Sequence, residues 1–211
     1  MSDAPTCTVV DHPLVKVGVT ILRDRETPVA DFRRVLRELS VLVGIEASRD
    51  LGLDGCTIHT PLATCGGFRL SRPVVLLPIL RAGLGMAEAL LAVFPSARVG
   101  HIGLYRDETT FEPHSYYFKT PDLTDAEVFV VDPMLATGQS GADAIDKLKA
   151  AGATRLRLLC LIASKPGVAH FHARHPDVPV VTAALDDSLN EKAYIVPGLG
   201  DAGDRYFGTG G

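Results

Sequence analysis

One stretch decides the fold of this chain: EVFVVDPMLATGQS, residues 127–140. Residues 128–131 are apolar and rich in valine, which is typical of a buried strand. The run ends at Asp132, and small residues from Thr137 to Ser140 then lead into a predicted helix. Unpaired amides and the positive end of a helix dipole meet at such a helix start, so the loop predicts an anion site.

The acid beside this loop narrows the class of ligand. Parallel α/β sheets bind ligands beyond the carboxyl ends of their strands, which is where Asp132 would lie. A carboxylate next to an anion site suits a ligand with both hydroxyl groups and phosphate, such as a sugar phosphate. An ordinary turn, in which Asp132 only caps the loop, is the alternative that this stretch alone leaves open.

Two common nucleotide-binding motifs do not match the chain. The P-loop needs a lysine after its second glycine, and none follows here. The dinucleotide-binding fingerprint fails as well, because Glu88 stands where Gly83-Leu84-Gly85 requires a third glycine or an alanine.

Composition limits the classes of protein. A chain of 211 residues with 46% hydrophobic content predicts a single domain, residues 1–211. The net charge is −4 and no run of Lys or Arg occurs, so we expect no nucleic-acid partner. No apolar stretch reaches the roughly 20 residues of a membrane span, and residues 1–5 lack the pattern of a signal peptide. We therefore expect a cytoplasmic protein without a membrane partner.

The cysteines and histidines do not form a recognisable metal or redox motif. Cys7, Cys56, Cys65 and Cys160 are scattered without a C-x-x-C pair, and we expect reduced thiols, with Cys160 in the core. The histidine cluster at 170–175 does not match zinc spacing, and we interpret it as a solvated helix end before a proline.

Strands and helices alternate along the chain. This alternation predicts the α/β class with a mostly parallel central sheet flanked by helices. Two segments break it: 105–124, which is aromatic and charged and is expected to be a flexible arm or loop, and the Gly/Pro-rich tail 186–211. The predicted strands cover 74–79, 98–104, 127–132, 155–163 and 178–185, and helices are expected after Pro28, at 86–93 and after Ser140.

Two arginines follow predicted strands. Arg81 precedes the small residues Ala82 and Gly83, where a backbone can approach a ligand closely. Arg106 follows the strand at 98–104. A guanidinium group offers a fork of donors to adjacent phosphate oxygens, so both are candidates for a diphosphate, while a tight turn and a solvated strand edge are the plain alternatives.

Four blocks in sequence carry a resemblance to a known family. They are 79–86 (ILRAGLGM), 105–108 (YRDE), 132–138 (DPMLATG) and the tail segment 194–205. Together they resemble uracil phosphoribosyltransferase, with matching order and spacing from about residue 10 to residue 209. The resemblance implies the type I phosphoribosyltransferase fold, with a small hood formed by the termini. It also implies conversion of uracil and 5-phospho-α-D-ribose 1-diphosphate (PRPP) to UMP and diphosphate in pyrimidine salvage.

The resemblance also implies the roles of individual residues. Arg81, Arg106, Asp132 and Asp201 would be the catalytic residues, with Mg²⁺ held mainly through the diphosphate and not by direct protein ligands. Uracil would be bound by the tail through Ile195, Gly200, Asp201 and Ala202. The residues implied to bind PRPP are Arg81, Arg106, Asp132, Pro133, Met134, Leu135, Ala136, Thr137, Gly138, Gln139, Ser140 and Asp201.

Gln139 departs from the glycine that many relatives have at this position. A side chain is tolerated there if only its amide faces phosphate, whereas a loop that needs positive φ would resist it. Pro133 stands where many phosphoribosyltransferases for other bases place a second acid.

Two other functions stay open beside the main one. A pyrimidine-sensing RNA-binding attenuator on the same fold would need a basic surface, and a transferase for another nucleobase would need a different tail. The resemblance further implies a homo-oligomer, a dimer or larger, and relatives that respond to GTP make this nucleotide a possible effector.

Overall fold

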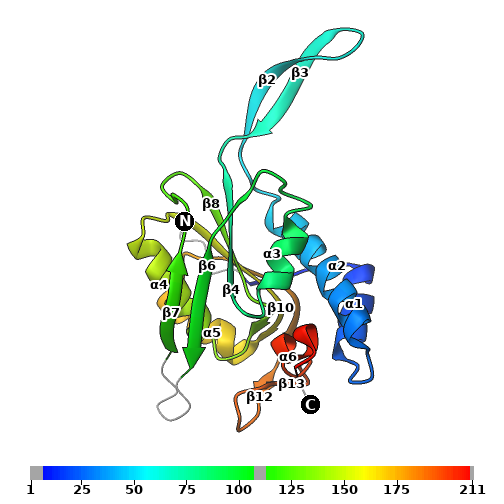
Figure 1. Cartoon of the computed structure of the whole chain (residues 1–211), viewed down its shortest axis with the longest axis vertical. Helices are drawn as coiled ribbons and strands as arrows, with labels where there is room; N and C mark the ends of the chain where they lie inside the picture. Colours follow the sequence, from blue (N-terminus) through cyan, green and yellow to red (C-terminus); the bar gives the residue numbers. More distant parts are fainter. Residues whose placement is uncertain (1–6, 107–112, 210–211) are drawn as a thin grey trace.

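The computed structural model describes residues 7–106 and 113–209, and of residues 104–106 and 113–115 it describes the backbone. Helices flank a central sheet on both faces (Figure 1). Across the described ranges, no helix combines the length and apolar character that a membrane span requires.

The central sheet has nine strands and is mostly parallel, as predicted. All neighbouring pairs are parallel except β6 and β7, which are antiparallel. β5 (Arg98–Val99) pairs with β4, and β9 (Met134–Leu135) pairs with β10. The main path runs β1 (Cys7–Val9), β11 (Val180–Asp186), β10 (Arg155–Ser164), β8 (Glu127–Val131), β4 (Val74–Leu80), β6 (His101–Arg106) and β7 (Pro113–Lys119).

Alternate side chains of the strands enter two separate cores. Leu76 and Phe129 pack with the helices of one face, whereas Val75 and Val130 pack with those of the other. A strand that is buried on both faces is apolar along its buried length, which explains the unbroken apolar run at residues 128–131 of β8. The first core contains α1 (Pro13–Arg23), α2 (Val29–Ala47), α3 (Leu84–Leu90) and α6 (Ala202–Phe207), and the second contains α4 (Gln139–Ala150) and α5 (Lys165–Arg174).

The expectation of an irregular segment at 105–124 was wrong for part of its length. Residues 113–119 form β7, an edge strand that pairs antiparallel with β6. Its sequence, PHSYYFK, is rich in aromatic residues that favour strands, and a proline is tolerated at the first residue of an edge strand. Residues 107–112 lie outside the described residues.

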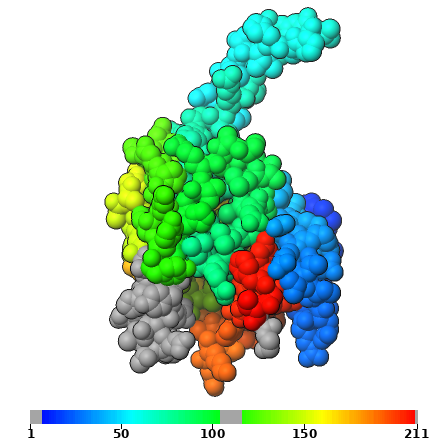
Figure 2. Space-filling model, viewed as in Figure 1, coloured from blue at the N-terminus to red at the C-terminus, as the bar shows by residue number. Residues whose placement is uncertain are grey.

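A two-stranded hairpin that the sequence did not predict rises from the body of the molecule (Figures 1 and 2). It consists of β2 (Leu53–His59) and β3 (Thr64–Leu70), paired antiparallel from Leu53↔Leu70 to His59↔Thr64. Phe68 is 76% exposed, so this hairpin buries little apolar surface of its own. Without a core to face, its strands lack the alternation by which a half-buried strand is recognised.

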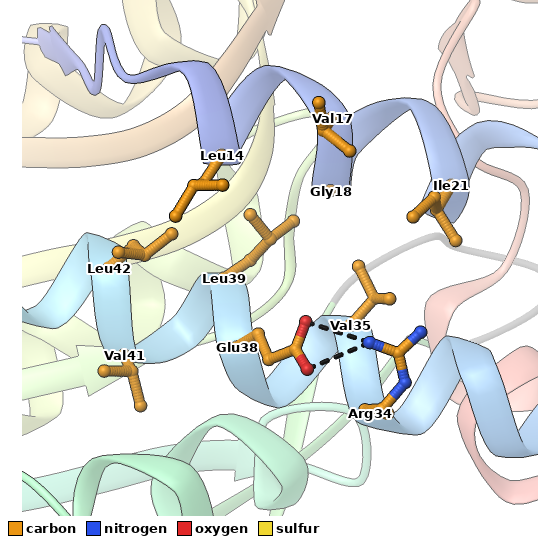
Figure 3. A pocket seen from close by; sticks show the side chains of 10 residues that line it. All are labelled: Leu14, Val17, Gly18, Ile21, Arg34, Val35, Glu38, Leu39, Val41 and Leu42. Atoms are coloured by element: carbon orange, nitrogen blue, oxygen red, sulfur yellow. Dashed lines mark hydrogen bonds and ion pairs between the residues drawn. The ribbon is translucent and has the colours of Figure 1, made fainter.

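Helices α1 and α2 lie side by side and leave an apolar groove between them (Figure 3). The helix predicted after Pro28 is α2, whereas α1 was not predicted. Leu14 and Val17 of α1 are 62% and 58% exposed and line this groove together with Leu42 of α2. Figure 3 also shows the exposed ion pair between Arg34 and Glu38 at its edge.

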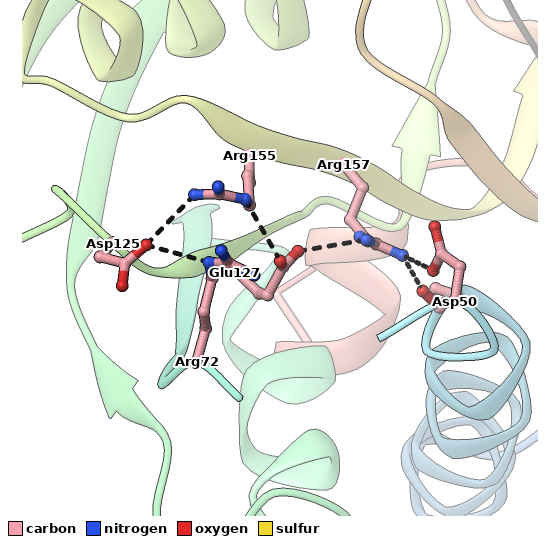
Figure 4. A network of polar contacts seen from close by, with 7 residues as sticks. Asp50, Arg72, Asp125, Glu127, Arg155 and Arg157 are labelled. Carbon is pink, nitrogen blue, oxygen red and sulfur yellow. Dashed lines mark hydrogen bonds and ion pairs between the residues drawn. The ribbon is translucent and has the colours of Figure 1, made fainter. Parts of the chain in front are cut away.

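A network of ion pairs lies at the amino-terminal ends of β8 and β10 (Figure 4). Arg157 Nη2 lies 3.2 Å from Glu127 Oε2, and Arg157 Nη1 lies 2.6 Å from Asp50 Oδ1 beyond the end of α2. Arg155 and Arg72 both contact Asp125, at 3.3 and 2.9 Å. Because Glu127 begins β8 and Asp132 follows its end, this network lies at the opposite end of the strand from the candidate site.

The interpretation of the histidine cluster as a solvated helix end was wrong for His175. This side chain is 3% exposed and follows α5 directly. Its Nε2 lies 3.0 Å from the carbonyl oxygen of Ala142, and its Nδ1 lies 3.2 Å from Lys149 Nζ. His175 therefore packs α5 against α4.

Candidate functional site

The order of the strands reverses between β4 and β8. From β4 the chain passes through α3 to β6 on one side, whereas β8 lies on the other side of β4 and leads through α4 to β10. Such a reversal opens a crevice at the carboxyl ends of the two strands, where α/β proteins bind ligands. The loops that begin at Arg81 and at Asp132 meet there.

The predicted phosphate loop connects β8 to α4. Gly138 caps α4 with a left-handed backbone, φ +80°, and a Cβ atom on it would lie 2.4 Å from the carbonyl oxygen of Gly167. The first hydrogen bond within the helix runs from the amide of Ala142 to the carbonyl oxygen of Gly138. The amides of Ser140 and Gly141 come before this bond in the chain and have no acceptor within the helix. They border a small cavity, as an anion site at a helix start requires.

Gln139 fits the loop because the positive φ falls on Gly138 and not on Gln139. Gln139 is the first residue of α4, and its Nε2 lies 3.5 Å from Asp143 Oδ2. Asp143 also accepts a hydrogen bond of 2.6 Å from Arg174. The Gln139 side chain therefore lies along α4.

The Ser164 side chain holds the loop through a hydrogen bond to its backbone, a role that the sequence did not predict. Its hydroxyl donates to the carbonyl oxygen of Ala136 at 2.6 Å and accepts from the amide of Gly167 at 2.9 Å. The side chain is fully buried at the end of β10. An apolar strand that ends in Ser164-Lys165-Pro166 predicts a helix cap, but not this contact with the loop.

Two adjoining cavities occupy the crevice. One, of about 110 Å³, is bordered by Thr137, Gly138, Ser140 and the preceding loop residues. The other, of about 460 Å³, is bordered by the tail and by Ala82. They share the lining residues Asp132, Met134 and Ala136.

Asp132 stands where the two cavities meet. It follows β8 directly, and its amide donates to the carbonyl oxygen of Leu159 at 3.1 Å. Burial raises the pKa of Asp132 to about 7, the backbone amide of Met134 opposes that rise, and the charge of Asp201 adds to it. A carboxyl group whose pKa lies near neutrality changes its charge readily when a ligand arrives.

The Arg81 loop packs against the end of β8. Gly83 lies so close that a Cβ atom would be 2.4 Å from the carbonyl oxygen of Val131. The Arg81 side chain is 60% exposed, contacts Asp204 at 3.6 Å and lies 5.7 Å from the ring centre of Phe207. Ala82, and not Arg81, lines the larger cavity.

The tail supplies the remaining wall of the larger cavity. It forms β12 (Ser188–Leu189), β13 (Ile195–Val196) and α6. Asp201 caps α6, with Oδ1 accepting from the amide of Asp204 at 2.8 Å. All four residues predicted to bind a base lie on this wall: Ile195, Gly200, Asp201 and Ala202.

Only some of the other residues predicted to bind PRPP line a cavity. Met134, Leu135 and Ala136 line the smaller cavity, whereas neither Pro133 nor Gln139 does. The carbonyl oxygen of Pro133 instead accepts from the amides of β10, which anchors the loop. The backbone of Arg106 ends β6 at the same edge of the sheet, and its side chain is outside what the structure describes.

A comparison with protein families assigns the chain to a family. The family model of uracil phosphoribosyltransferase matches residues 9–209. The chain belongs to the uracil phosphoribosyltransferase family. A uracil phosphoribosyltransferase of Mesorhizobium japonicum is 56% identical over 204 residues, which cover 96% of this chain and 98% of the relative. One of Levilactobacillus brevis is 51% identical, covering 95% and 97%.

Solved structures support the fold of this family member. The AQ2163 protein of Aquifex aeolicus superposes with a TM-score of 0.92 at 34% identity, covering 96% of this chain and 98% of that one. A hypoxanthine-guanine phosphoribosyltransferase of Bacillus anthracis gives a TM-score of 0.52 at 14% identity, covering 75% and 80%. The predicted type I phosphoribosyltransferase fold is confirmed.

Proposed function

We propose that the chain transfers the phosphoribosyl group of PRPP to uracil, giving UMP and diphosphate. The supporting observation is the pair of adjoining cavities that share Asp132, one beside a helix start and one beside the tail. A sugar phosphate in the smaller cavity would present its anomeric carbon toward a base in the larger one.

The phosphate loop is proposed to bind the 5′-phosphate of PRPP. The amides that precede the ladder of α4 donate to its oxygens, and the hydroxyl groups of Thr137 and Ser140 border the same cavity. Asp132 would accept hydrogen bonds from the ribose hydroxyls. Arg81 and Arg106 would contact the diphosphate, in which case Arg81 exchanges its long contact with Asp204 for phosphate oxygens.

The tail is proposed to bind uracil. Ile195 is 4% exposed and offers an apolar surface, while Gly200, Asp201 and Ala202 place backbone groups along the same wall. Backbone donors and acceptors matched to the N3–H and carbonyl groups of uracil would reject cytosine, because its amino group would leave buried polar groups unpaired.

Mg²⁺ is the proposed cofactor, bound chiefly through the diphosphate. Among the residues that the structure describes, no group of three or more His, Cys, Asp or Glu side chains could hold a metal ion. The carboxylates of Asp132 and Asp201 on the cavity wall are oxygen donors of the kind that Mg²⁺ prefers, so the site suits an ion that arrives with its substrate. When bound, it supplies positive charge to the leaving group.

The reaction needs no covalent nucleophile on the protein. Uracil N1 forms the new bond to the anomeric carbon and loses its proton to solvent or to the departing diphosphate. The bond between the anomeric carbon and the diphosphate breaks, and its electron pair leaves on the diphosphate oxygen. Positive charge develops on the ribose ring, next to which Asp132 is proposed to lie. Catalysis then rests on positioning and on the stabilisation of charge by Asp132 and the arginines.

The proposed function is tested with a panel of bases. The protein is incubated with PRPP, Mg²⁺ and either uracil, cytosine, hypoxanthine or adenine, and the release of pyrophosphate is measured. We expect pyrophosphate release in the incubation that contains uracil and in none of the other three. Release with a purine and not with uracil would identify a transferase for another base, and salt-sensitive RNA binding in a filter assay would support the attenuator.

Replacing Asp132 with asparagine should raise KM for PRPP by about tenfold and lower kcat, because ribose hydroxyls lose a charged acceptor. Binding of uracil to the tail should survive, so the effect on the KM of uracil stays small. Steady-state kinetics with each substrate varied in turn measures this difference. Unchanged kinetics would remove Asp132 from the ribose site.

The pH dependence of the same carboxyl group gives a second measurement of Asp132. Since burial raises its pKa to about 7, kcat/KM for PRPP should rise as pH increases through 7 and then level off. The Asn variant, which cannot titrate there, serves as the control for ionisation of PRPP itself. In the folded protein the carboxylate form costs stability above the ordinary pKa of 3.8, and the full cost is reached above about 7. The melting temperature of the Asn variant minus that of wild type should therefore increase as pH rises from 3.8 to about 7.

Three broader properties belong to the same proposal. A homo-oligomer is supported by the exposed apolar groove of α1 and α2. The free thiols of all four cysteines agree with a cytoplasmic enzyme. Regulation by GTP stays a prediction to which we assign no residues.

A further inference from the structure

A largely buried ion pair joins α1 to the end of β11. Arg23 is the last residue of α1, and Asp186 is the last residue of β11. Arg23 donates from Nη2 to Asp186 Oδ1 at 2.6 Å and from Nη1 to Oδ2 at 2.8 Å. The side chain of Asp186 is 7% exposed and that of Arg23 is 23% exposed, so solvent screens this two-point contact little.

The same pair binds both backbone polar groups of Gly198 in the tail. Arg23 Nη1 donates to the carbonyl oxygen of Gly198 at 2.9 Å, and the amide of Gly198 donates to Asp186 Oδ2, also at 2.9 Å. Gly198 has φ +55°, and a Cβ atom on it would lie 2.2 Å from the carbonyl oxygen of Ile195. The turn from Ile195 to Gly198 is thereby fixed relative to β11.

Arg205 holds the next residue of the tail from the other side. Its Nη1 donates to the carbonyl oxygens of Leu199, at 2.9 Å, and of Leu22, and its Nη2 donates to that of Asp24 at 2.6 Å. Its guanidinium group lies 4.4 Å from the ring centre of Phe32. Gly198 and Leu199 therefore lie between two arginine anchors. They belong to the segment that connects Ile195 to the residues Gly200 to Ala202 of the cavity wall.

A buried ion pair adds little net stability, because the cost of removing both charges from water offsets their attraction. Its larger effect is to fix the position of the backbone that it binds, here that of Gly198. A neighbouring pair provides a contrast: Lys165 and Asp187 lie 2.5 Å apart with side chains 63% and 80% exposed, and neither lines the cavities of the site.

We propose that Arg23 and Asp186 are positioning residues for the base: they hold Gly198 so that the wall from Ile195 to Ala202 keeps the shape that binds uracil. The inference rests on the proposed function. Neither side chain lines the cavities of the site, so both act through the tail. Nothing in this contact reaches the phosphate loop, and the two substrates should therefore respond differently.

The test replaces Asp186 with Asn and Arg23 with Lys. Asn cannot accept from Arg23 and Gly198 with both side-chain atoms, and Lys cannot span the carboxylate and the carbonyl group together. Both variants should raise KM for uracil about tenfold and leave KM for PRPP within about twofold, as expected when charge-assisted bonds that shape one subsite are lost. Asp187→Asn, next in sequence but exposed, is the matched control and should match wild type.

Two further readouts separate positioning from general destabilisation. Hydrogen exchange of the tail peptide 190–205 should accelerate in both variants, while exchange of α4 stays as in wild type. Equal increases in the KM of both substrates, or a lower melting temperature with unchanged kinetics, would overturn the proposal. If Asp186→Asn does not fold, Arg23→Lys, which keeps the positive charge, gives the same comparison. Wild-type protein that releases no pyrophosphate with uracil would refute the proposed function instead.

Discussion

Replacing Arg106 with alanine is expected to lower kcat/KM by about two to three orders of magnitude, because one transition-state charge contact contributes roughly 3 to 4 kcal/mol. β6 pairs with β4 through Ile79↔Ile102 and Leu80↔Gly103, so the backbone of Arg106 reaches the edge of the sheet from which the Arg81 loop starts. The proposed contact with the departing diphosphate is made from this edge.

The matched control for this variant is Arg98→Ala. Arg98 is exposed and begins β5, at the amino-terminal end of the sheet, so its loss should leave kinetics unchanged. The melting temperatures of both variants should stay near that of wild type. Turnover of the Arg106 variant close to wild type would show that this arginine does not contact the diphosphate.

Replacing Gly138 with alanine is expected to lower kcat/KM for PRPP about a hundredfold, because a displacement of about 1 Å near the reacting groups has an effect of that size. The added Cβ atom would lie 2.4 Å from the carbonyl oxygen of Gly167, and φ is +80°. Relief of that clash must move the loop or α5. Left-handed strain for a residue other than glycine also costs about 1 to 2 kcal/mol of stability.

Gly152→Ala separates strain from displacement. Gly152 has φ +93°, but a Cβ atom there meets nothing within 4 Å. This control should lose about 1 to 2 kcal/mol of stability with unchanged kinetics, since only the strain is added. If the Gly138 variant behaved in the same way, its loop would not bind the 5′-phosphate.

The loop from Asp132 to Ser140 could be predicted from sequence because its structural determinants are local. An apolar strand, Asp132 at its end and a glycine before a helix occupy one short stretch, and the structure places them as expected. The tolerance of a side chain at Gln139 also has a local explanation, because the left-handed conformation falls on Gly138.

The supports of the site could not be predicted, because their partners are distant in sequence. Ser164 contacts Ala136 across 28 positions, and Arg23 contacts Asp186 across 163. No periodicity or motif encodes such pairs. The tail, which is a Gly/Pro-rich segment in the sequence, is anchored by side chains from α1, β11 and α6.

Three of the strands that were missed, β2, β3 and β7, lie at the periphery. β7 is an edge strand, and the hairpin of β2 and β3 projects from the body, so neither shows the buried apolar run that marks β4 and β8. Strands are recognised in a sequence through the faces that they bury, and these bury little.

The most direct test of the central claim is the identity of the product. The protein is incubated with uracil, PRPP and Mg²⁺, and the mixture is analysed by liquid chromatography and mass spectrometry alongside a pyrophosphate assay. The account predicts UMP and pyrophosphate in equal amounts, with neither formed when uracil is omitted. Pyrophosphate without UMP, or no product at all, would contradict it.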